Sequence, residues 1–270
     1  MTKNFLEGKG ALITGGASGF GKGVGLELAQ KGADIILVDI NEESLEKTSK
    51  DIESKTKRKV IPIICDVSDV KQVKQLAEQT YKEVDNVFIL FNNAGICPAA
   101  GKNILRVKER DWDIILNVNL KGQWLVGKTF GPKIRRQDFD PISGKIIHTA
   151  SIAGINVDSF IPIYSISKVG IIALMELLAK ELAPRVTVNA ISPGYHVTGI
   201  YANDEDLMKD TMDMGHVKTP LNRYGTVEDV VRLVNFLASP SSDFITGHNF
   251  PIDGGIVDIG VPAWYLKSDI

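Results

Sequence analysis

The stretch ALITGGASGFG, residues 11–21, decides the fold of this 270-residue chain. A short apolar run, Ala11–Thr14, leads straight into a glycine-rich turn, and a helical pattern follows from Gly21 to Lys31. Glycine allows positive φ angles in a tight turn and lets the backbone approach a phosphate group closely. The free N–H groups at the start of the next helix favour an anion. Glycine clusters also occur in ordinary turns, but the position between a strand and a helix indicates a pyrophosphate-binding loop.

The same alternation of short apolar runs and amphipathic stretches continues along nearly the whole chain. The runs are rich in Ile and Val and apolar on both faces, which is typical of strands buried in a parallel sheet. The expected strands are 11–14, 34–38, 60–65, 87–91, 145–149 and 186–191. The expected helices are 21–31, 42–56, 70–84, 112–133, 165–182 and 227–237, with Asn41 and Thr226 as N-caps. The pattern predicts an α/β fold: a single-domain Rossmann-type doubly wound parallel sheet flanked by helices.

No internal repeat or linker divides the sequence, so we expect one domain over residues 1–270. The least regular part, about 195–221, is polar and contains several methionines. We expect it to form a substrate lid, because long loops in compact domains are often functional. The aromatic C-terminal tail, 256–270, either packs on a neighbouring subunit or covers its own site, and the sequence leaves both possibilities open.

Composition and charge exclude several function classes. A net charge of −2 argues against nucleic-acid and membrane-surface partners, which require a basic field. No stretch approaches the roughly 20 apolar residues of a membrane span. The chain has 2 cysteines and an N-terminus unlike a signal peptide, so we expect cytoplasmic localisation. The 4 histidines are scattered without metal-ligand spacing, so we expect no metal site.

Asp39 ends the second expected strand, about 20 residues beyond the glycine loop. A carboxylate there can accept hydrogen bonds from both hydroxyls of an adenosine ribose, and it would repel a 2′-phosphate. Ser18 occupies a loop position where a basic residue could otherwise hold that phosphate. Both features predict NAD(H) rather than NADP(H), although the residues alone also allow Asp39 to be a simple turn cap.

Tyr164 and Lys168 lie four residues apart in YSISK, so they share one face of an expected helix. Tyrosine has a pKa near 10 in water, which is too high for a base at neutral pH. A nearby ammonium stabilises the phenolate and lowers that pKa, so the pair could act as an acid/base. On spacing alone, a Tyr and a Lys on a solvated helix face would be the more ordinary explanation.

Several further motifs decide between these alternatives. The loop TGGASGFG, the run NNAG at 92–95, Ser151 placed 13 residues before Tyr164, and YSISK occur in this order. Together they resemble the short-chain dehydrogenase/reductase family, from Gly8 to about Gly255. The later residues Pro193, Gly194 and Thr198, and the run DGG at 253–255, resemble it too. The resemblance implies an NAD-dependent enzyme acting on CH–OH groups.

The resemblance implies a catalytic set of Ser151, Tyr164, Lys168 and Asn119. Tyr164 would be the general acid/base, and Ser151 would hydrogen-bond the same substrate oxygen. Lys168 would lower the pKa of the tyrosine and bind the nicotinamide ribose. Asn119 would support a water relay to the lysine. Hydride would pass to or from the nicotinamide, so the cofactor would carry the redox chemistry.

The resemblance also implies the contacts of an NAD cofactor. The expected cofactor-binding residues are Gly15, Ser18, Gly19, Phe20, Gly21, Asp39, Ile40, Asp66, Val67, Asn93, Ala94, Gly95, Tyr164, Lys168, Pro193, Gly194, His196 and Thr198. The family often has Ile or Val where this chain has His196, whose side chain is either an ordinary loop residue or faces the substrate. Asn92 would shape the same pocket, but 92–95 can equally be a strand-ending turn.

The sequence says least about the substrate. The expected lining mixes apolar and polar groups without an obvious charged anchor: Ile152, Ala153, Ile155, Val157, Phe160, Tyr195, His196, Ile200, Tyr201 and 95–99. The predicted lid is rich in acidic residues, which are poorly matched to an acidic acyl carrier protein. We therefore expect a small-molecule secondary alcohol or ketone, first a polyol or sugar, then a hydroxysteroid, then 3-oxoacyl-carrier-protein reduction.

Two further expectations concern the kind of protein and its assembly. A non-catalytic nucleotide-binding regulator is the alternative from another function class, and the presence of all four catalytic residues argues against it. The family resemblance implies a homo-oligomer, a dimer or a homotetramer. The run GIIALMELLA, residues 170–179, is apolar enough for an interface, although one buried face would explain it equally well.

Overall fold

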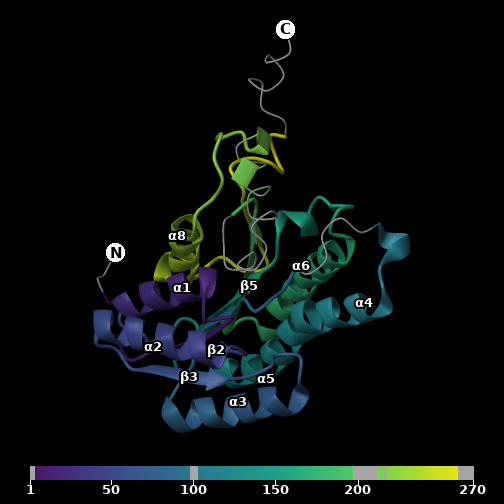
Figure 1. The fold of residues 1–270 in the computed structure, drawn as a ribbon. Coiled ribbons are helices and arrows are strands. Elements are labelled where there is room, and N and C mark those ends of the chain that lie inside the picture. The colour runs from purple at the N-terminus through teal and green to yellow at the C-terminus, as the bar shows by residue number, and fades with distance from the viewer. Residues whose placement is uncertain are drawn as a thin grey trace.

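Seven parallel strands form one sheet with helices on both faces, as seen in a computed structural model that describes residues 4–97, 103–196, 209, 212–213, 215 and 217–260 (Figure 1). The strand order is β3-β2-β1-β4-β5-β6-β7. The strands are β1 (Gly10–Thr14), β2 (Asp34–Asp39), β3 (Val60–Ile64), β4 (Ile89–Asn92), β5 (Gly144–Thr149), β6 (Val186–Pro193) and β7 (Asn249–Ile252). The predicted single-domain α/β fold is confirmed.

Each face of the sheet carries its own hydrophobic core. One face is covered by α1 (Gly19–Gln30), α2 (Glu42–Thr56) and α8 (Val227–Ala238), and the other by α3 (Val70–Glu83), α4 (Glu109–Leu116), α5 (Gln123–Arg135) and α6 (Pro162–Leu182). Neighbouring strand residues alternate between the two cores, so that Ile13 packs toward the first and Leu12 toward the second. This double burial explains why the strand sequences are apolar throughout.

The topology places a crevice at the carboxyl ends of the central strands. β1 lies between β2 and β4. From β1 the chain adds β2 and β3 on one side, and it then crosses over to add β4 and the later strands on the other side. Ligands of such sheets bind where the strand order reverses, outside the carboxyl ends of the strands. The glycine loop, residues 15–18, lies at this point between β1 and α1.

The structure differs from the sequence predictions at two elements. The helix expected over 112–133 starts at Glu109 and is interrupted by a π-helical turn, Asn117–Gly122, between α4 and α5. Such turns are frequent at functional sites. β7 was not predicted, because its four residues pair only with β6 and include Pro251, which an edge strand tolerates.

Both predicted helix caps are confirmed. The Asn41 side chain accepts a hydrogen bond of 2.9 Å from the Ser44 N–H, and Thr226 forms a capping box with Asp229. Among the described residues, α6 is the helix long and apolar enough to span a membrane by length and composition. It packs with α5 and β6, as the core helix of a soluble protein does.

Candidate active site

A cavity of about 720 Å³ opens at the carboxyl ends of the strands. Its walls come from the segments that follow β1, β4, β5 and β6, together with the first turns of α6. It brings together most of the residues singled out from the sequence: Gly15, Ser18, Gly19, Phe20, Asp39, Asn93, Ala94, Gly95, Ser151, Tyr164, Lys168, Pro193, Gly194 and His196.

The glycine loop has the geometry of an anion cradle. Gly15 and Gly19 have φ angles of 66° and 51°, in the region that favours glycine. A Cβ atom on Gly21 would collide with the Gly15 carbonyl oxygen, so this glycine packs the start of α1 against the loop rather than lining the cavity. The N-cap Ser18 makes no side-chain capping bond, which leaves the first N–H groups of α1 available to an anion.

The Asp39 carboxylate is fixed directly beside this loop. Its Oδ2 accepts a hydrogen bond of 3.1 Å from the Ala17 N–H, and its Oδ1 accepts one of 3.1 Å from the Asn41 N–H. Ile40 is 69% exposed and does not line the cavity. Lys22, the first base after the loop, pairs with Asp51 at 3.2 Å. The charge beside the loop is therefore the negative charge of Asp39.

The Asn93 side chain ties three strand ends together. Its Nδ2 donates to the Thr14 carbonyl oxygen at 3.1 Å, and its Oδ1 accepts from the Thr149 hydroxyl at 3.1 Å. The Asn93 and Ala94 N–H groups both donate to the Thr14 hydroxyl, at 2.8 and 3.0 Å. Asn92 thus ends β4 away from the cavity, whereas residues 93–95 follow the strand and form part of the cavity wall.

Tyr164 and Lys168 lie on one face of α6, and both line the cavity. The Lys168 Nζ is 5.3 Å from the centroid of the Tyr164 ring and donates a hydrogen bond of 2.8 Å to the Thr149 carbonyl oxygen. Burial lowers the pKa of Lys168 to about 8. An ammonium held next to a phenol favours the phenolate, so the pair has the geometry of an acid/base.

Ser151 and Asn119 occupy different positions relative to the cavity. Ser151 follows β5, lines the cavity, and accepts the Ala153 N–H at 3.1 Å as the N-cap of a short 3₁₀ helix, Ile152–Gly154. Asn119 lies in the π-helical turn, fully buried behind the wall. Its Oδ1 accepts the Ile96 N–H at 2.8 Å, and its Nδ2 donates to the Ile96 carbonyl oxygen at 2.9 Å. Asn119 therefore holds the segment after β4 against α6.

Two residues that sequence reasoning missed lie behind Lys168. The Nδ1 of His148 and the Oε1 of Gln123 are 2.8 Å apart, and the Gln123 Nε2 donates at 3.2 Å to the same Thr149 carbonyl that Lys168 contacts. Burial, helped by the Lys168 charge, lowers the pKa of His148 to about 3, so its imidazole is neutral. His148 and Gln123 come from β5 and α5, and no local motif pairs them.

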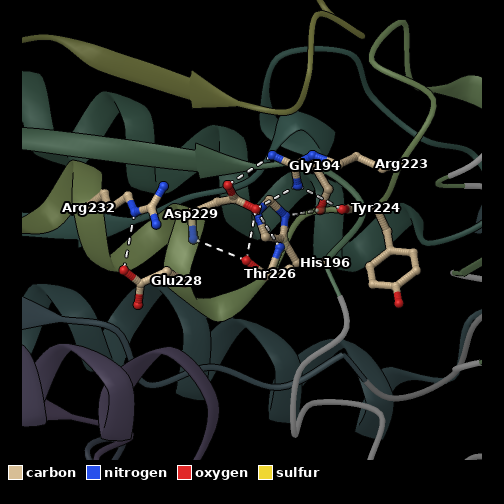
Figure 2. Close-up of polar contacts among 8 residues, drawn as sticks. All are labelled: Gly194, His196, Arg223, Tyr224, Thr226, Glu228, Asp229 and Arg232. Carbon is tan, nitrogen blue, oxygen red and sulfur yellow. Dashed lines mark hydrogen bonds and ion pairs between the residues drawn. The ribbon is translucent and has the colours of Figure 1, made fainter.

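His196 is buried beside the nicotinamide end expected for the cavity, and Figure 2 shows its polar surroundings. Its Nδ1 is 3.2 Å from the Gly194 carbonyl oxygen, and its ring meets the Phe20 ring edge-on at 5.5 Å. A Cβ atom on Gly225 would collide with the His196 ring. Burial lowers the pKa of His196. The imidazole is a neutral packing element between the phosphate loop and the segment before α8.

The segment before α8 is itself firmly anchored. Arg223 forms two hydrogen bonds with the Asp229 carboxylate, at 2.7 and 2.9 Å, as Figure 2 also shows. The same carboxylate accepts the Thr226 N–H at 2.8 Å. The Arg223 guanidinium holds the pKa of Asp229 well below its usual range. The anchored segment gives the His196 ring a fixed support.

Other predicted cofactor residues lie away from the cavity wall. Asp66 accepts hydrogen bonds from the Ser68 N–H and hydroxyl at 2.9 and 2.7 Å, and Val67 packs on Gly122. Asp66, Val67, Ile40 and Gly21 do not line the cavity. Thr198, most of the predicted lid and residues 261–270 lie outside the described residues.

The substrate lining was expected to lack an obvious charged anchor, but the cavity wall contains two charged residues that were not predicted. Asp158 and Lys218 line it, together with Asn156, Ser159, Ile256 and Val257. Of the predicted substrate lining, Ile152, Ala153, Val157 and Tyr195 contribute, Ile155 and Phe160 do not, and Ile200 and Tyr201 lie outside the described residues. The loop between Ser151 and Tyr164 presents polar side chains that an apolar pattern search passes over. Residues 256 and 257 of the predicted tail help to line the chain's own cavity.

Known proteins resemble the chain over nearly its whole length. A family model described as enoyl-(acyl carrier protein) reductase matches residues 15–257. The 3-oxoacyl-(acyl-carrier-protein) reductase FabG of Thermotoga maritima is 38% identical over 253 residues, covering 93% of this chain and 99% of the relative. The chain belongs to the short-chain dehydrogenase/reductase family. It is an oxidoreductase related to enzymes that act on alcohols and ketones.

Two further relatives of this short-chain dehydrogenase/reductase carry sugar-related names. The 2-dehydro-3-deoxy-D-gluconate 5-dehydrogenase of Dickeya dadantii is 34% identical over 256 residues, covering 93% of this chain and 96% of the relative. The structure of NAD⁺-bound xylitol dehydrogenase superposes with a TM-score of 0.83 at 30% identity, covering 93% of this chain and 99% of that one. A nicotinamide cofactor is therefore expected in the cavity.

Proposed function

We propose that the protein is an NAD(H)-dependent oxidoreductase that interconverts a secondary alcohol and a ketone of the polyol or sugar class. The observation that carries the cofactor choice is the Asp39 carboxylate, held at 3.1 Å from the Ala17 nitrogen beside the glycine loop. A 2′-phosphate at this position would meet a negative charge, whereas ribose hydroxyls would find an acceptor. The sequence segments 15–20 and 39–41 contain no basic residue to offset that charge.

The cavity residues fit a dinucleotide. A Cβ atom on Gly15 would lie 2.9 Å from the Asn93 Nδ2 and 3.1 Å from the Ala94 Cα, so a glycine lets the loop pack closely on the residues that follow β4. Gly15, Ser18 and Gly19 would hold the pyrophosphate at the start of α1, with Asp39 at the adenosine ribose. Pro193, Gly194 and Lys168 would meet the nicotinamide end. When bound, NAD would supply the hydride chemistry.

The catalytic roles follow from the groups that face the cavity. Tyr164 gives a proton to the carbonyl oxygen of the substrate in reduction and accepts it in oxidation. The Ser151 hydroxyl donates a hydrogen bond to the same oxygen and holds it in line. The Lys168 ammonium stabilises the tyrosine phenolate. Asn119 acts indirectly, because it fixes Ile96 and the segment that carries Gly95 against α6.

The substrate class is supported by the lining and by the relatives. Asn156, Asp158 and Ser159 offer polar groups that suit hydroxyl-rich molecules better than a steroid skeleton. A second candidate, 3-oxoacyl-carrier-protein reduction, is favoured by the 38% identity to the Thermotoga maritima relative. We rank it lower because the sequence of 195–221 contains more acidic than basic residues, an excess of negative charge that is poorly matched to an acidic carrier.

A direct assay separates these candidates. Purified protein is supplied with NAD⁺ or NADP⁺ and with polyols, hydroxysteroids and simple secondary alcohols, and with NADH or NADPH and an acetoacetyl thioester. Turnover of a polyol with NAD⁺ is the expected result. Preferential reduction of the thioester with NADPH would replace the proposal by the second candidate, and NADH binding without any turnover would favour a nucleotide-binding regulator.

We propose that the protein is cytoplasmic. We also propose that it forms a homodimer or homotetramer through α4, α5 and α6. Large apolar side chains that are at least one third exposed gather on α4, α5 and α6: Trp112, Ile114, Trp124, Ile166, Val169 and Leu177. An exposed apolar surface of this kind is typical of an association site. Light scattering coupled to size exclusion should give a mass of two or four chains, and a mass of one chain would contradict this.

A further inference from the structure

Asp158 lies in the wall of the catalytic cavity, on the loop between Ser151 and Tyr164. The side chain is half-buried, and its Oδ1 accepts a hydrogen bond of 2.8 Å from the Phe160 N–H. An ionised carboxylate is an acceptor with about four lone-pair positions, so one backbone N–H leaves most of its capacity for a ligand. Within the described lining, this carboxylate and that of Asp39 are the negative charges.

The position of Asp158 is fixed to the catalytic helix. The Ser165 hydroxyl accepts the Asp158 N–H at 3.1 Å and donates to the Asp158 carbonyl oxygen at 3.2 Å. Ser165 is fully buried on α6 and directly follows Tyr164. Because one buried hydroxyl binds both backbone groups of Asp158, the backbone at this residue is held against the helix that carries Tyr164.

The charge of Asp158 acts on the substrate end of the cavity. Burial raises the pKa of the Cys97 thiol to about 11, with Lys168 opposing the rise and Asp158 adding to it. Burial and then Asp158 raise the pKa of Tyr195. All four groups line the same cavity, and the Cys97 thiol lies within the electrostatic reach of both Lys168 and Asp158. Asp158 therefore stands near the catalytic groups, while Asp39 stands at the phosphate loop.

We infer that Asp158 is a specificity-determining residue that binds a second hydroxyl group of the substrate, one that does not react. The inference rests on the proposed function, because it requires an alcohol or ketone in this cavity. Hydrogen bonds from hydroxyl groups to a carboxylate are stronger than those between neutral groups. A site built to bind a hydroxyl group discriminates against an analogue that lacks it, because the buried acceptor is then left unpaired.

The same carboxylate restricts the kind of group that can lie directly against it. Asp158 would repel a carboxylate or phosphate placed there, so the group that it binds is a neutral hydroxyl. A monofunctional secondary alcohol still fits the Ser151 and Tyr164 pair, but it offers Asp158 no donor. Asp158 should therefore control the ratio of diol turnover to monoalcohol turnover.

The test compares native protein with Asp158→Asn and Asp158→Ala on two substrate sets. The first contains 2,3-butanediol, glycerol and xylitol, and the second contains 2-butanol and 2-pentanol, all with NAD⁺. We expect the Asp158→Ala change to lower kcat/KM for the best polyol by about 10- to 100-fold, the loss of one charge-assisted hydrogen bond. The kcat/KM for the monoalcohols should change less than about threefold, because the alcohol contacts of Ser151 and Tyr164 are retained. Asp158→Asn keeps an acceptor for the Phe160 N–H, and its effect should be smaller.

The control is Asp138→Asn, which removes the same charge from an exposed residue in the loop that leads into the amino end of β5, opposite the carboxyl ends that form the cavity. It should leave both substrate sets unchanged, and NADH binding by all variants would show that they are folded. An equal loss on polyols and monoalcohols, or no loss on either, would overturn the role of Asp158 while the proposed function stands. If the native protein turned over no alcohol of either set, the proposed function would fail and this inference with it.

Discussion

The Lys168 ammonium donates a hydrogen bond of 2.8 Å to the carbonyl oxygen of Thr149, the last residue of β5. This bond joins α6 to the end of β5 in the cavity wall. It also holds the ammonium at the side of the Tyr164 ring, 5.3 Å from its centroid. Lys168 is only 2% exposed, and this burial lowers its pKa from 10.5 to about 8. The charge on which Tyr164 depends can therefore be lost at mildly alkaline pH.

The first prediction is a fall in ketone reduction as the pH rises through about 8. Below this value Lys168 is an ammonium that supports Tyr164, and above it the amine is neutral. In Lys168→Arg the guanidinium stays charged throughout, so the fall should move to higher pH even though the overall rate is lower. The measurement is kcat/KM with NADH between pH 6 and 10. An identical fall near pH 8 in the variant would assign it to another group.

The second prediction concerns Gln123, which holds the carbonyl that Lys168 contacts. Gln123→Leu removes the donor to Thr149 and leaves the buried His148 without its partner. We expect a loss of about 1–3 kcal/mol in the free energy of unfolding, the cost of an unpaired buried polar group. Urea unfolding followed by circular dichroism measures it. The exposed residue Gln79 offers a control, since Gln79→Leu should change the stability by less than about 0.5 kcal/mol; equal effects would show that the buried contacts contribute nothing.

The third prediction is that His148 weakens the fold in acid. Its pKa is lowered from 6.5 to about 3, so the folded state binds fewer protons than the unfolded chain between these values. The stability from the neutral imidazole is complete above pH 6.5 and is lost as the pH falls toward 3. His148→Asn should remove up to about 1.4 kcal/mol per pH unit from the acid slope of the unfolding free energy. A native slope in His148→Asn would refute the assignment.

The fourth prediction tests the buried Lys145. Its Nζ contacts the Asp243 carboxylate at 2.7 Å and donates to the Ser239 carbonyl at 2.6 Å, and the side chain is 1% exposed. Asp243→Ala should cost about 3–5 kcal/mol of unfolding free energy, because it leaves a buried charge without its counter-ion. Lys145→Met together with Asp243→Ala should recover part of that loss. No difference between the single and double variants would show that the ion pair does not matter.

The fifth prediction concerns cofactor choice. Asp39→Arg should shift the ratio of kcat/KM values from NAD⁺ toward NADP⁺ by at least about tenfold, because it replaces a repelling charge with one that binds a phosphate. Glu53→Gln, which removes an acidic charge from the exposed face of α2 outside the cavity wall, is the matched control and should leave the ratio unchanged. An unchanged ratio in Asp39→Arg would mean that other groups select the cofactor.

The sequence was sufficient to predict the features that depend on local patterns. Six of the seven strands were expected because residues such as Leu12 and Ile13 are both apolar, each serving one of the two cores. The caps at Asn41 and Thr226 were recognised because an N-cap bonds residues only two or three positions ahead. The position of Tyr164 and Lys168 on one face of α6 followed from their helical spacing, and their role stays a prediction from the family resemblance.

Features that depend on contacts between distant segments could not be predicted. The His148–Gln123 contact joins β5 to α5, and the Ser165 hydroxyl binds a loop residue seven positions earlier. Asp158 was missed because the search for lining residues followed mainly apolar positions, whereas this loop also contributes the polar residues Asn156, Asp158 and Ser159 to the lining. β7 lacks a distinctive pattern because it is short and lies at the sheet edge.

The central claim is that Tyr164 moves the proton at a nicotinamide-dependent alcohol or ketone site, and Tyr164→Phe tests it most directly. NADH binding is followed by fluorescence, and turnover of the best polyol with NAD⁺ by nicotinamide absorbance, for the native protein and the variant. The account predicts unchanged NADH affinity and a loss of turnover of at least about a hundredfold, the contribution of one acid/base group. Substantial turnover in the variant, with the same substrate and cofactor, would contradict it.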